Sequence, residues 1–302
     1  MSISKALRER LSGLEKIKLY IGKGPVQVCG LIPPAKLNFT GAVCAFFEKN
    51  VIFIAESDYV AKKRADELSY FLPEQVLFFP AKELEFFKAD ARSLEVQHQR
   101  LSVLEKLQAV ERPMVTVMSV DGLLQFTVTI QDYKKSELSI SGGDEISIDA
   151  LSERLVQMGY VREDMVEGKG QFSVRGGIVD VFSPTGENPY RIELFGDEID
   201  SIRSFDVFTQ VSVENLESIT VGPANEGFES ENHETSVLSY FDKDAIVIFD
   251  EPKAISERAE GLKWDIEETV KTYRTAKQAQ TCSSWDRDFE VVKIREIIEI
   301  LE

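Results

Sequence analysis

In the first 120 residues of the chain, strand-length runs of apolar residues alternate with longer segments of helical periodicity. The spacing predicts strands at residues 26–30, 51–55, 76–79 and 114–120. It predicts helices at residues 36–49, 57–71 and 92–111, and Ser57 can cap the second of these. Short apolar strands that alternate with helices favour a parallel sheet with helices on both faces, so the sequence predicts an α/β domain here.

The pattern changes after residue 124. Residues 126–148 are short segments rich in β-formers, and residues 149–158 have the spacing of an amphipathic helix closed by Gly159. Four strands joined by short turns are then predicted, at residues 171–174, 178–182, 190–194 and 199–205. A meander of antiparallel strands with one helix indicates a small α+β domain.

The last third of the chain returns to the style of the first. Residues 222–235 have little periodicity and are expected to be a loop. An all-apolar strand follows at residues 245–249, and helical spacing at 257–280 and 292–301. We therefore expect this part to complete the first sheet. The expected domains are residues 1–122, an inserted domain at 123–210, and a second segment at 211–302.

The formal net charge of the chain is −17 at pH 7. A field of that sign repels the phosphate backbone of nucleic acids at long range, which disfavours direct nucleic-acid binding by this segment. An acidic surface also serves solubility, so both interpretations stay open. Three distant cysteines, Cys29, Cys44 and Cys282, indicate a reducing cytoplasmic environment and no disulfide framework.

Metal-dependent and nucleophilic catalysis have no obvious residues here. The two histidines, His98 and His233, are far apart, and no Cys/His cluster has the spacing of metal ligands. We therefore expect neither a metal site nor a Ser/His/Asp or Cys/His catalytic site. No apolar stretch approaches the ~20 residues that span a bilayer, so no membrane partner is expected.

Residues 30–37, which read GLIPPAKL, lie between a predicted strand and a predicted helix, the context of a phosphate-binding loop. Gly30 and Lys36 suit such a loop. Ala35 replaces its second glycine, and Leu37 replaces the Ser or Thr hydroxyl that binds Mg²⁺. The two prolines between them remove amide donors. The sequence predicts a disabled phosphate loop, with an ordinary strand-to-helix connection as the alternative.

An acidic pair, Asp250 and Glu251, directly follows the apolar strand predicted at residues 245–249. This arrangement is similar to the metal-holding strand of nucleotide-hydrolysing proteins. Acidic residues often end strands, however, and without a working phosphate loop these carboxylates have little catalytic use. We therefore attach no catalytic role to them.

The segment around residues 170–203 offers a candidate protein-binding surface. Strand periodicity places Tyr190, Ile192 and Leu194 on one face and Arg191, Glu193 and Phe195 on the other. Arg175 is expected on the face opposite Phe172 and Val174. If the first set is core, an exposed ring lies near arginines, which is the composition of an interface hot spot. The alternative is that Phe195 is core and that the arginines pair with neighbouring acidic residues.

Longer motifs connect this segment to known proteins. The stretch GQFSVRGGIVDVFSP…PYRIELFGDEIDSIRSFDVFTQ resembles a signature shared by transcription-repair coupling factors (Mfd) and the excision nuclease subunit UvrB. FFPAKELEFF and QRLSVLEKL resemble the first domain of the coupling factors. The disabled loop at residues 30–37 favours the coupling factors. The segment between Pro80 and Leu101 is also too short for the long hairpin with which UvrB grips DNA.

The resemblance implies a degenerate RecA-like (P-loop NTPase-like) parallel-sheet domain with a small inserted α+β domain. In this family the small domain recruits UvrA, and the residues for that contact match Arg175, Arg191 and Phe195, with Arg203 as a further position. The resemblance implies no catalysis and no cofactor for this segment. ATP and Mg²⁺ would serve the motor domains of a parent protein, of which this chain is expected to be a fragment or a truncated version. RNA polymerase and double-stranded DNA would bind other domains of that parent. The alternative is an ATP-dependent enzyme of the UvrB type.

Overall fold

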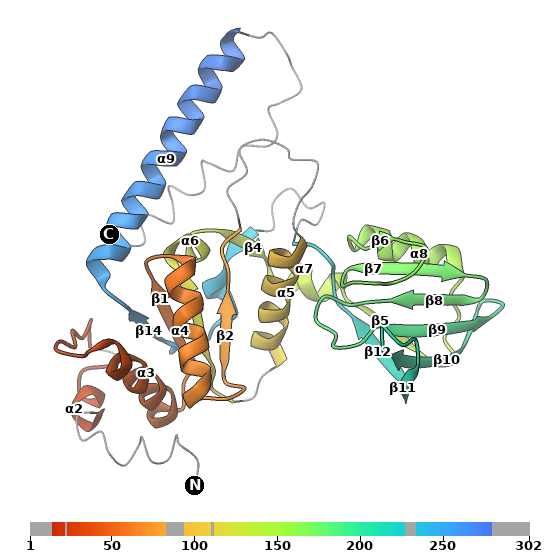
Figure 1. The fold of residues 1–302 in the computed structure, drawn as a ribbon, viewed down its shortest axis with the longest axis horizontal. Coiled ribbons are helices and arrows are strands. Elements are labelled where there is room, and N and C mark those ends of the chain that lie inside the picture. The colour runs from red at the N-terminus through yellow and green to blue at the C-terminus, as the bar shows by residue number, and fades with distance from the viewer. Residues whose placement is uncertain (1–13, 22, 83–93, 110–111, 227–233, 280–302) are drawn as a thin grey trace. The chain divides into compact units, whose positions relative to one another are not determined.

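The computed structural model of the chain describes residues 14–21, 23–82, 94–109, 112–226 and 234–279. Contacts between Cα atoms divide the chain into two compact units (Figure 1). Unit 1 contains residues 1–90, 109–125 and 236–302, and unit 2 contains residues 91–108 and 126–235. Residues 92–108 and 211–235 thus group with unit 2, whereas the sequence suggests the first domain for them. The domain boundaries at 122/123 and 210/211 remain predictions.

Unit 1 contains a four-stranded parallel sheet in the order β14-β1-β3-β2. Its strands are β1 (Val51–Ala55), β2 (Val76–Phe79), β3 (Val115–Ser119) and β14 (Ile246–Phe249). Every residue of β1 and β3 is buried, so both faces of these central strands are covered. The predicted parallel sheet, and the return of the chain to it near residue 245, are confirmed.

The predicted strand at residues 26–30 is wrong. These residues form no strand, and the side chains of Val26 and Val28 are exposed. Alternating apolar residues suggested a strand, but a strand also requires a neighbouring strand to pair with its backbone. Within the described residues, β14 and β3 are the two neighbours of β1, and residues 26–30 pair with neither edge of the sheet.

The helices of unit 1 are α2 (Leu14–Lys18), α3 (Pro33–Phe47), α4 (Asp58–Phe71), α6 (Val120–Leu123) and α9 (Pro252–Ala279), with a 3₁₀ helix at Val237–Tyr240. The helices predicted at residues 36–49, 57–71 and 257–280 are confirmed in type and differ in their ends, whereas α6 and the 3₁₀ helix were not predicted. Ser57 caps α4 as predicted, by accepting a hydrogen bond from the Val60 amide. The helix predicted at residues 36–49 begins three residues earlier, because proline fits the first turn of a helix. The helix predicted at 292–301 lies outside the described residues.

Unit 2 contains a six-stranded sheet in the order β11-β10-β9-β8-β7-β6. The strands are β6 (Val161–Arg162), β7 (Gln171–Arg175), β8 (Ile178–Val181), β9 (Tyr190–Phe195), β10 (Glu198–Phe205) and β11 (Ser212–Leu216). Neighbouring strands are antiparallel, except that β6 and β7 are parallel. The meander predicted at residues 171–205 is therefore confirmed, with a further strand at each side.

Helix α8 (Ile148–Gln157) and a two-stranded ribbon of β5 (Leu138–Ser141) and β12 (Ser218–Val221) contribute to the core of unit 2. The core contains Leu151 and Leu155 from α8 and alternate residues of the sheet. Gly159 follows α8 with a φ of +89°, as predicted for a glycine that closes a helix. We call the face of the six-stranded sheet opposite this core the outer face.

The segment after residue 124 is less β-rich than predicted. It contains strand β4 (Phe126–Val128), paired with β13 (Glu234–Ser236), and then helix α7 (Ile130–Ser136). Thr129 is β-branched and suggested a strand, but its hydroxyl caps α7 by accepting a hydrogen bond from the Asp132 amide at 3.1 Å. Helix α5 (Leu94–Ala109) confirms the helix predicted at 92–111 and belongs to unit 2.

No helix among the described residues is long and apolar enough to cross a membrane. The same residues include no group of three or more His, Cys, Asp or Glu side chains placed to hold a metal ion.

Candidate functional site

The start of α3, where the sequence suggests a disabled phosphate loop, offers no free amide at its first four positions. Pro33 and Pro34 have no N–H, and the amides of Ala35 and Lys36 donate to the carbonyl of Ile32 at 2.9 and 3.1 Å. Ile32 makes no side-chain cap. Helix starts bind phosphate through free amides, so these four positions contribute no phosphate donor.

Leu37 and Gly30, two other positions of this loop, also offer no side-chain group that could bind a nucleotide. Leu37 is buried in the core of unit 1, where an apolar side chain is stabilised and no hydroxyl is available. Gly30 has a φ of +82°, which glycine adopts at little cost. Lys36 is the one residue of this loop that could attract a phosphate, and its ammonium group is already paired.

Lys36 belongs to a network that we call the α3 ion cluster. Its Nζ contacts Oδ1 of Asp250 at 2.6 Å and also pairs with Glu251. Oδ2 of Asp250 accepts from Nε of Arg64 at 3.2 Å, and Arg64 also pairs with Glu67. Burial lowers the pKa of Lys36, but hydrogen bonds and attraction from Asp250 and Glu251 outweigh it, so the pKa lies above its usual value. The acidic pair after β14 therefore neutralises the lysine.

The outer face of unit 2 follows the strand-face prediction. In β9, Ile192 and Leu194 are buried in the core, and Tyr190 packs against it. The other alternate residues, Arg191, Glu193 and Phe195, lie on the outer face, and the Phe195 side chain is 85% exposed. The interpretation of Phe195 as a core residue is therefore excluded.

Arg191 lies in the middle of the outer face, and its guanidinium makes three hydrogen bonds. Its Nε and one Nη donate to the two carboxylate oxygens of Asp180 at 2.7 and 2.8 Å, and the same Nη donates to Gln210 at 2.9 Å. The guanidinium also lies 4.3 Å from the ring centroid of Phe205. The hydrogen bonds to Asp180 raise the pKa of Arg191 despite its partial burial. These contacts hold the arginine in one orientation.

Arg175 pairs with the same carboxylate. Its Nη lies 2.5 Å from Oδ2 of Asp180, and its side chain is 44% exposed, whereas that of Asp180 is 1% exposed. Two guanidinium groups thus share one carboxylate, and we call Arg175 and Arg191 with Asp180 the arginine pair. The pair has one positive charge in excess, and Arg175 presents it to solvent.

The positive charge of Arg203 is neutralised by a carboxylate of its own, that of Glu193. Arg203 lies opposite Arg191 on β10 and contacts Oε1 of Glu193 at 2.5 Å. The hydrogen bonds from Arg203 and Ser201 hold the pKa of Glu193 below its usual value. Arg203 therefore adds no excess charge to the outer face.

Both interpretations of this segment are thus partly right. The ring is exposed, as the interface interpretation predicts, and the arginines pair with acidic neighbours, as the alternative predicts. The expectation that Phe195 lies directly beside Arg191 is wrong. The two residues share a face but are separated by four strand steps, about 13 Å, and the guanidinium points to Asp180 and Phe205.

Comparison with known proteins identifies relatives of this part of the chain. Residues 138–226, from the start of β5 to beyond β12, match the family described as the UvrB interaction domain. The chain is 40% identical over 209 residues to the transcription-repair-coupling factor of Bacillus subtilis (strain 168), which covers 69% of this chain. It is 27% identical over 275 residues, 91% of the chain, to the transcription-repair-coupling factor of Staphylococcus aureus (strain USA300).

Most of the chain is similar to transcription-repair-coupling factors. The chain spans about a fifth of the length of these relatives, 18% of the first and 23% of the second. The part that matches the UvrB interaction domain contains the whole arginine pair, Phe195 and Arg203.

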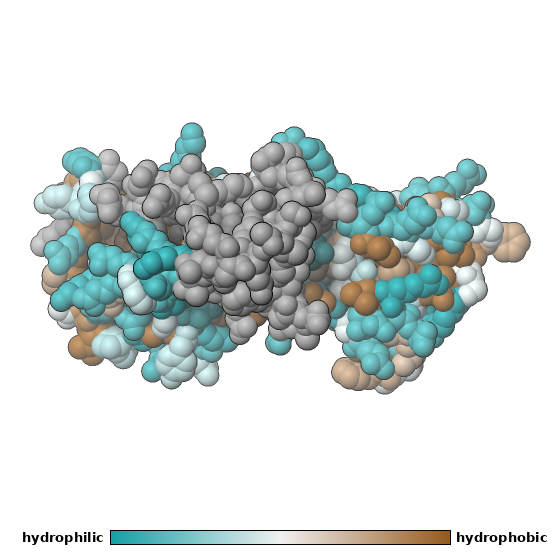
Figure 2. All heavy atoms as spheres, turned by 90° about the horizontal axis from the view of Figure 1, so that it is seen from above, coloured by the Kyte–Doolittle hydropathy of each residue, from teal (hydrophilic) through white to brown (hydrophobic). Residues whose placement is uncertain are grey.

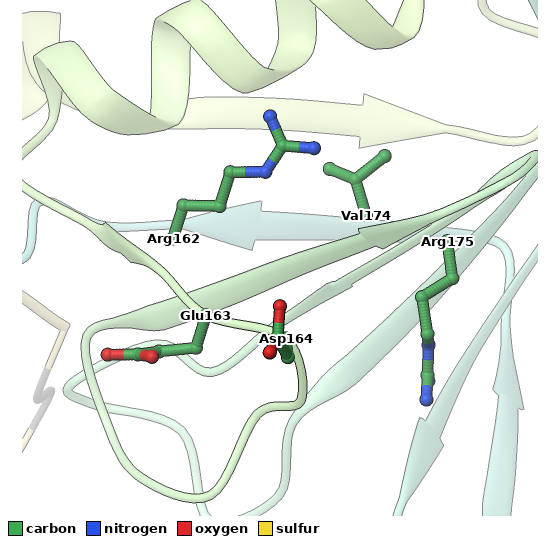
Figure 3. Close-up of a pocket in the computed structure, with 5 residues that line it drawn as sticks. All are labelled: Arg162, Glu163, Asp164, Val174 and Arg175. Carbon is green, nitrogen blue, oxygen red and sulfur yellow. The ribbon is translucent and has the colours of Figure 1, made fainter.

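A shallow pocket of about 410 Å³ lies beside Arg175 in this family domain. Figure 3 shows that the side chains of Arg162 and Arg175 point away from each other, with Glu163 and Asp164 on the loop between them. The lining thus includes two carboxylates, Glu163 and Asp164, which repel a phosphate group.

Two features of the family domain escaped the sequence interpretation. Asp180 was missed because its pairing with Arg191 depends on the register of β8 against β9, which the eight-residue connection between them does not determine. Its position between the core residues Val179 and Val181 does place it on the outer face. Phe208 was missed because it lies in a turn without periodicity. Figure 2 shows apolar side chains, in brown and tan, exposed among hydrophilic ones on the part formed by unit 2.

Proposed function

We propose that the outer face of unit 2 docks UvrA, and that the chain is a non-catalytic docking module in transcription-coupled nucleotide excision repair. The exposed ring of Phe195 carries the proposal: it lies on the strand face where a buried carboxylate orients the arginine pair. The match to the UvrB interaction domain and the relationship to transcription-repair-coupling factors support it.

The physical basis is an interface hot spot. A phenylalanine ring supplies a large apolar area and loses little side-chain entropy on binding, and arginine is enriched at the centres of interfaces. The arginine pair is already ordered, so binding does not have to pay for immobilising it. Its excess charge favours a partner surface that carries a carboxylate near an apolar recess.

The proposal includes a degenerate RecA-like domain, formed by residues 1–122 and 211–302, with the docking domain at 123–210 inserted. Two prolines and two occupied amides at the start of α3 support this, as does the α3 ion cluster. ATP and Mg²⁺ would then serve motor domains elsewhere in a longer protein. RNA polymerase and double-stranded DNA would also bind outside this segment.

The test is a calorimetric titration of the chain with UvrA. We expect Arg191→Ala and Phe195→Ala each to weaken binding by about 2 kcal/mol, roughly thirtyfold in Kd. Tyr70→Ala, which removes an 83% exposed ring from unit 1, is the matched control and should bind as the wild type does. Wild-type affinity of both outer-face variants, with folding intact, would refute the proposed site.

The alternative function is an ATP-dependent enzyme of the UvrB type, for which the loop at residues 30–37 before α3 and the acidic pair Asp250 and Glu251 after β14 are the supporting features. Titration with Mg·ATP discriminates the two. We expect no saturable binding at micromolar nucleotide, because Lys36 is paired and the first four helix positions have no free amide. Micromolar affinity would favour the enzyme.

A further inference from the structure

The turn between β10 and β11 presents an apolar surface that the arginine pair and Phe195 do not account for. Phe208, at the tip of the turn, is 91% exposed, the highest value of any large apolar side chain among the described residues. Val211 and Val213 follow it and are 63% and 59% exposed. Single exposed apolar residues are common on protein surfaces, but three within six residues form a patch.

The turn is held in one conformation by its own hydrogen bonds. Oδ1 of Asp206 accepts from the amides of Phe208 and Thr209 at 3.1 and 2.7 Å, and from the Thr209 hydroxyl at 2.8 Å. The Asp206 amide donates to the carbonyl of Val211 at 2.9 Å. Gln210 has a left-handed φ of +59°, a conformation that costs energy outside glycine. The turn therefore presents the Phe208 ring from an ordered backbone.

Gln210 connects this turn to the arginine pair. Its side-chain oxygen accepts from Arg191 at 2.9 Å, and its side-chain nitrogen donates to the carbonyl of Val207 at 2.9 Å. On β11, Asn215 pairs with the outward-facing Arg203, but the register shifts between Ser204 and Phe205, so that Ser212 pairs with Phe205 and Val213 lies in a β-bulge. Through Gln210 the turn that carries Phe208 is thus hydrogen-bonded to the arginine pair, and the exposed Val211 and Val213 follow it along the chain into the edge strand of the same sheet.

We propose that Phe208 is a second aromatic anchor of the docking face, and that the protein which binds Phe195 also covers Phe208, Val211 and Val213. This inference rests on the proposed function. Arg191 is hydrogen-bonded to Gln210 in the turn, so a partner that covers the arginine pair also reaches the turn. β9 and β11 are two strand spacings apart, about 10 Å, well within a standard footprint of about 800 Å² per partner. The expected partner surface has an apolar recess for each ring and a carboxylate that faces Arg175.

The experiment is a titration of UvrA against the chain and four variants, one of which is the Phe195→Ala variant of the proposed function. We expect Phe208→Ala to raise Kd about tenfold, as the loss of an anchoring ring does. Phe208→Tyr keeps the ring and should bind within about twofold of wild type. Tyr70→Ala again controls for the loss of an exposed ring. Thermal unfolding of each variant should match the wild type, because Phe208 has little buried surface to lose.

The outcomes separate this inference from the proposed function. If Phe195→Ala weakens binding and Phe208→Ala does not, the second anchor is refuted and the docking face stands. If neither variant weakens binding, both ideas are refuted. Sedimentation of the chain alone tests a second copy as the occupant. A self-association that Phe208→Ala abolishes, with unchanged affinity for UvrA, would assign the patch to that contact and overturn the inference.

Discussion

The two units balance the charges of their ion pairs in opposite ways. In the α3 ion cluster of unit 1, two cations meet three carboxylates, and the buried carboxylate at the centre has other anions beside it. In the arginine pair of unit 2, two cations share one carboxylate, with no second anion within ion-pair distance among the described residues. In the α3 ion cluster the carboxylates neutralise both cations. In the arginine pair one positive charge is not neutralised.

Because of this difference, the α3 ion cluster is a closed charge arrangement, in which the cations have no need of a further anion, and the arginine pair is an open one, which can accept a further anion. Lys36 gains nothing by binding a phosphate, because its carboxylate partners would have to be displaced first. Arg175 keeps 44% of its side chain exposed and shares its partner, so an incoming carboxylate adds an interaction without breaking one. The nature of the surrounding ion pairs, and not the presence of basic residues, distinguishes the two regions.

The largest effect that would sharpen this comparison is expected from Asp180→Ala. The substitution leaves two guanidinium groups together without a counter-charge, and Arg191 is only 13% exposed. We expect a loss of about 3 kcal/mol in the free energy of unfolding of unit 2. Urea titration measures the loss, and amide exchange in β9 and β1 assigns it to unit 2 or unit 1.

The matched variant in unit 1 is Asp250→Ala, which also removes a nearly buried carboxylate from two cations. Here the loss should be only about 1 kcal/mol, since Lys36 keeps Glu251 and Arg64 keeps Glu67. Equal losses of unfolding free energy in the two variants would mean that the remaining carboxylates of unit 1 do not compensate its cations, and would contradict the difference between the two units.

The smallest effect concerns pH and His98 of helix α5, in unit 2. The ring is buried against Gly170, and its Nε2 has no hydrogen-bond partner among the described residues. Burial, together with the charge of Lys169, lowers the pKa of His98 below its usual value, although a hydrogen bond with the backbone of Ala224 opposes this. The unfolded chain therefore takes up the proton first as the pH falls.

The stabilising contribution is present above the ordinary histidine pKa of about 6.5 and is lost as the pH falls through the lower value of the folded state. We expect unit 2 to lose stability as the pH falls below about 7, and the His98→Asn variant to lose less. Urea midpoints across this range provide the measurement. A slope that is the same in both proteins would show that another group is responsible.

Much of the fold could be predicted from local patterns. Apolar runs identified β1, β2, β3 and β14, and alternation in β9 put Phe195 and Ile192 on opposite faces, without deciding which face is the outer one. These predictions succeeded because burial of apolar side chains decides where such segments lie. The prediction of a strand at residues 26–30 was wrong, because its sequence pattern was suitable but no neighbouring strand pairs with these residues. The prediction of β structure at Thr129 was wrong because its hydroxyl caps a helix, and this capping outweighs the β propensity of threonine.

The sequence alone determined most element types of both units, the position of Phe195 on the strand face opposite Ile192, and the loss of phosphate donors at Pro33 and Pro34. These are properties of single residues or of neighbours along one element. The tertiary structure alone decided which charges meet: Lys36 and Asp250 are 214 positions apart, and Arg191 finds Asp180 only through the register of two strands. An ion pair depends on distance in space, which local sequence does not encode, so the closed and open charge arrangements became visible only in the fold.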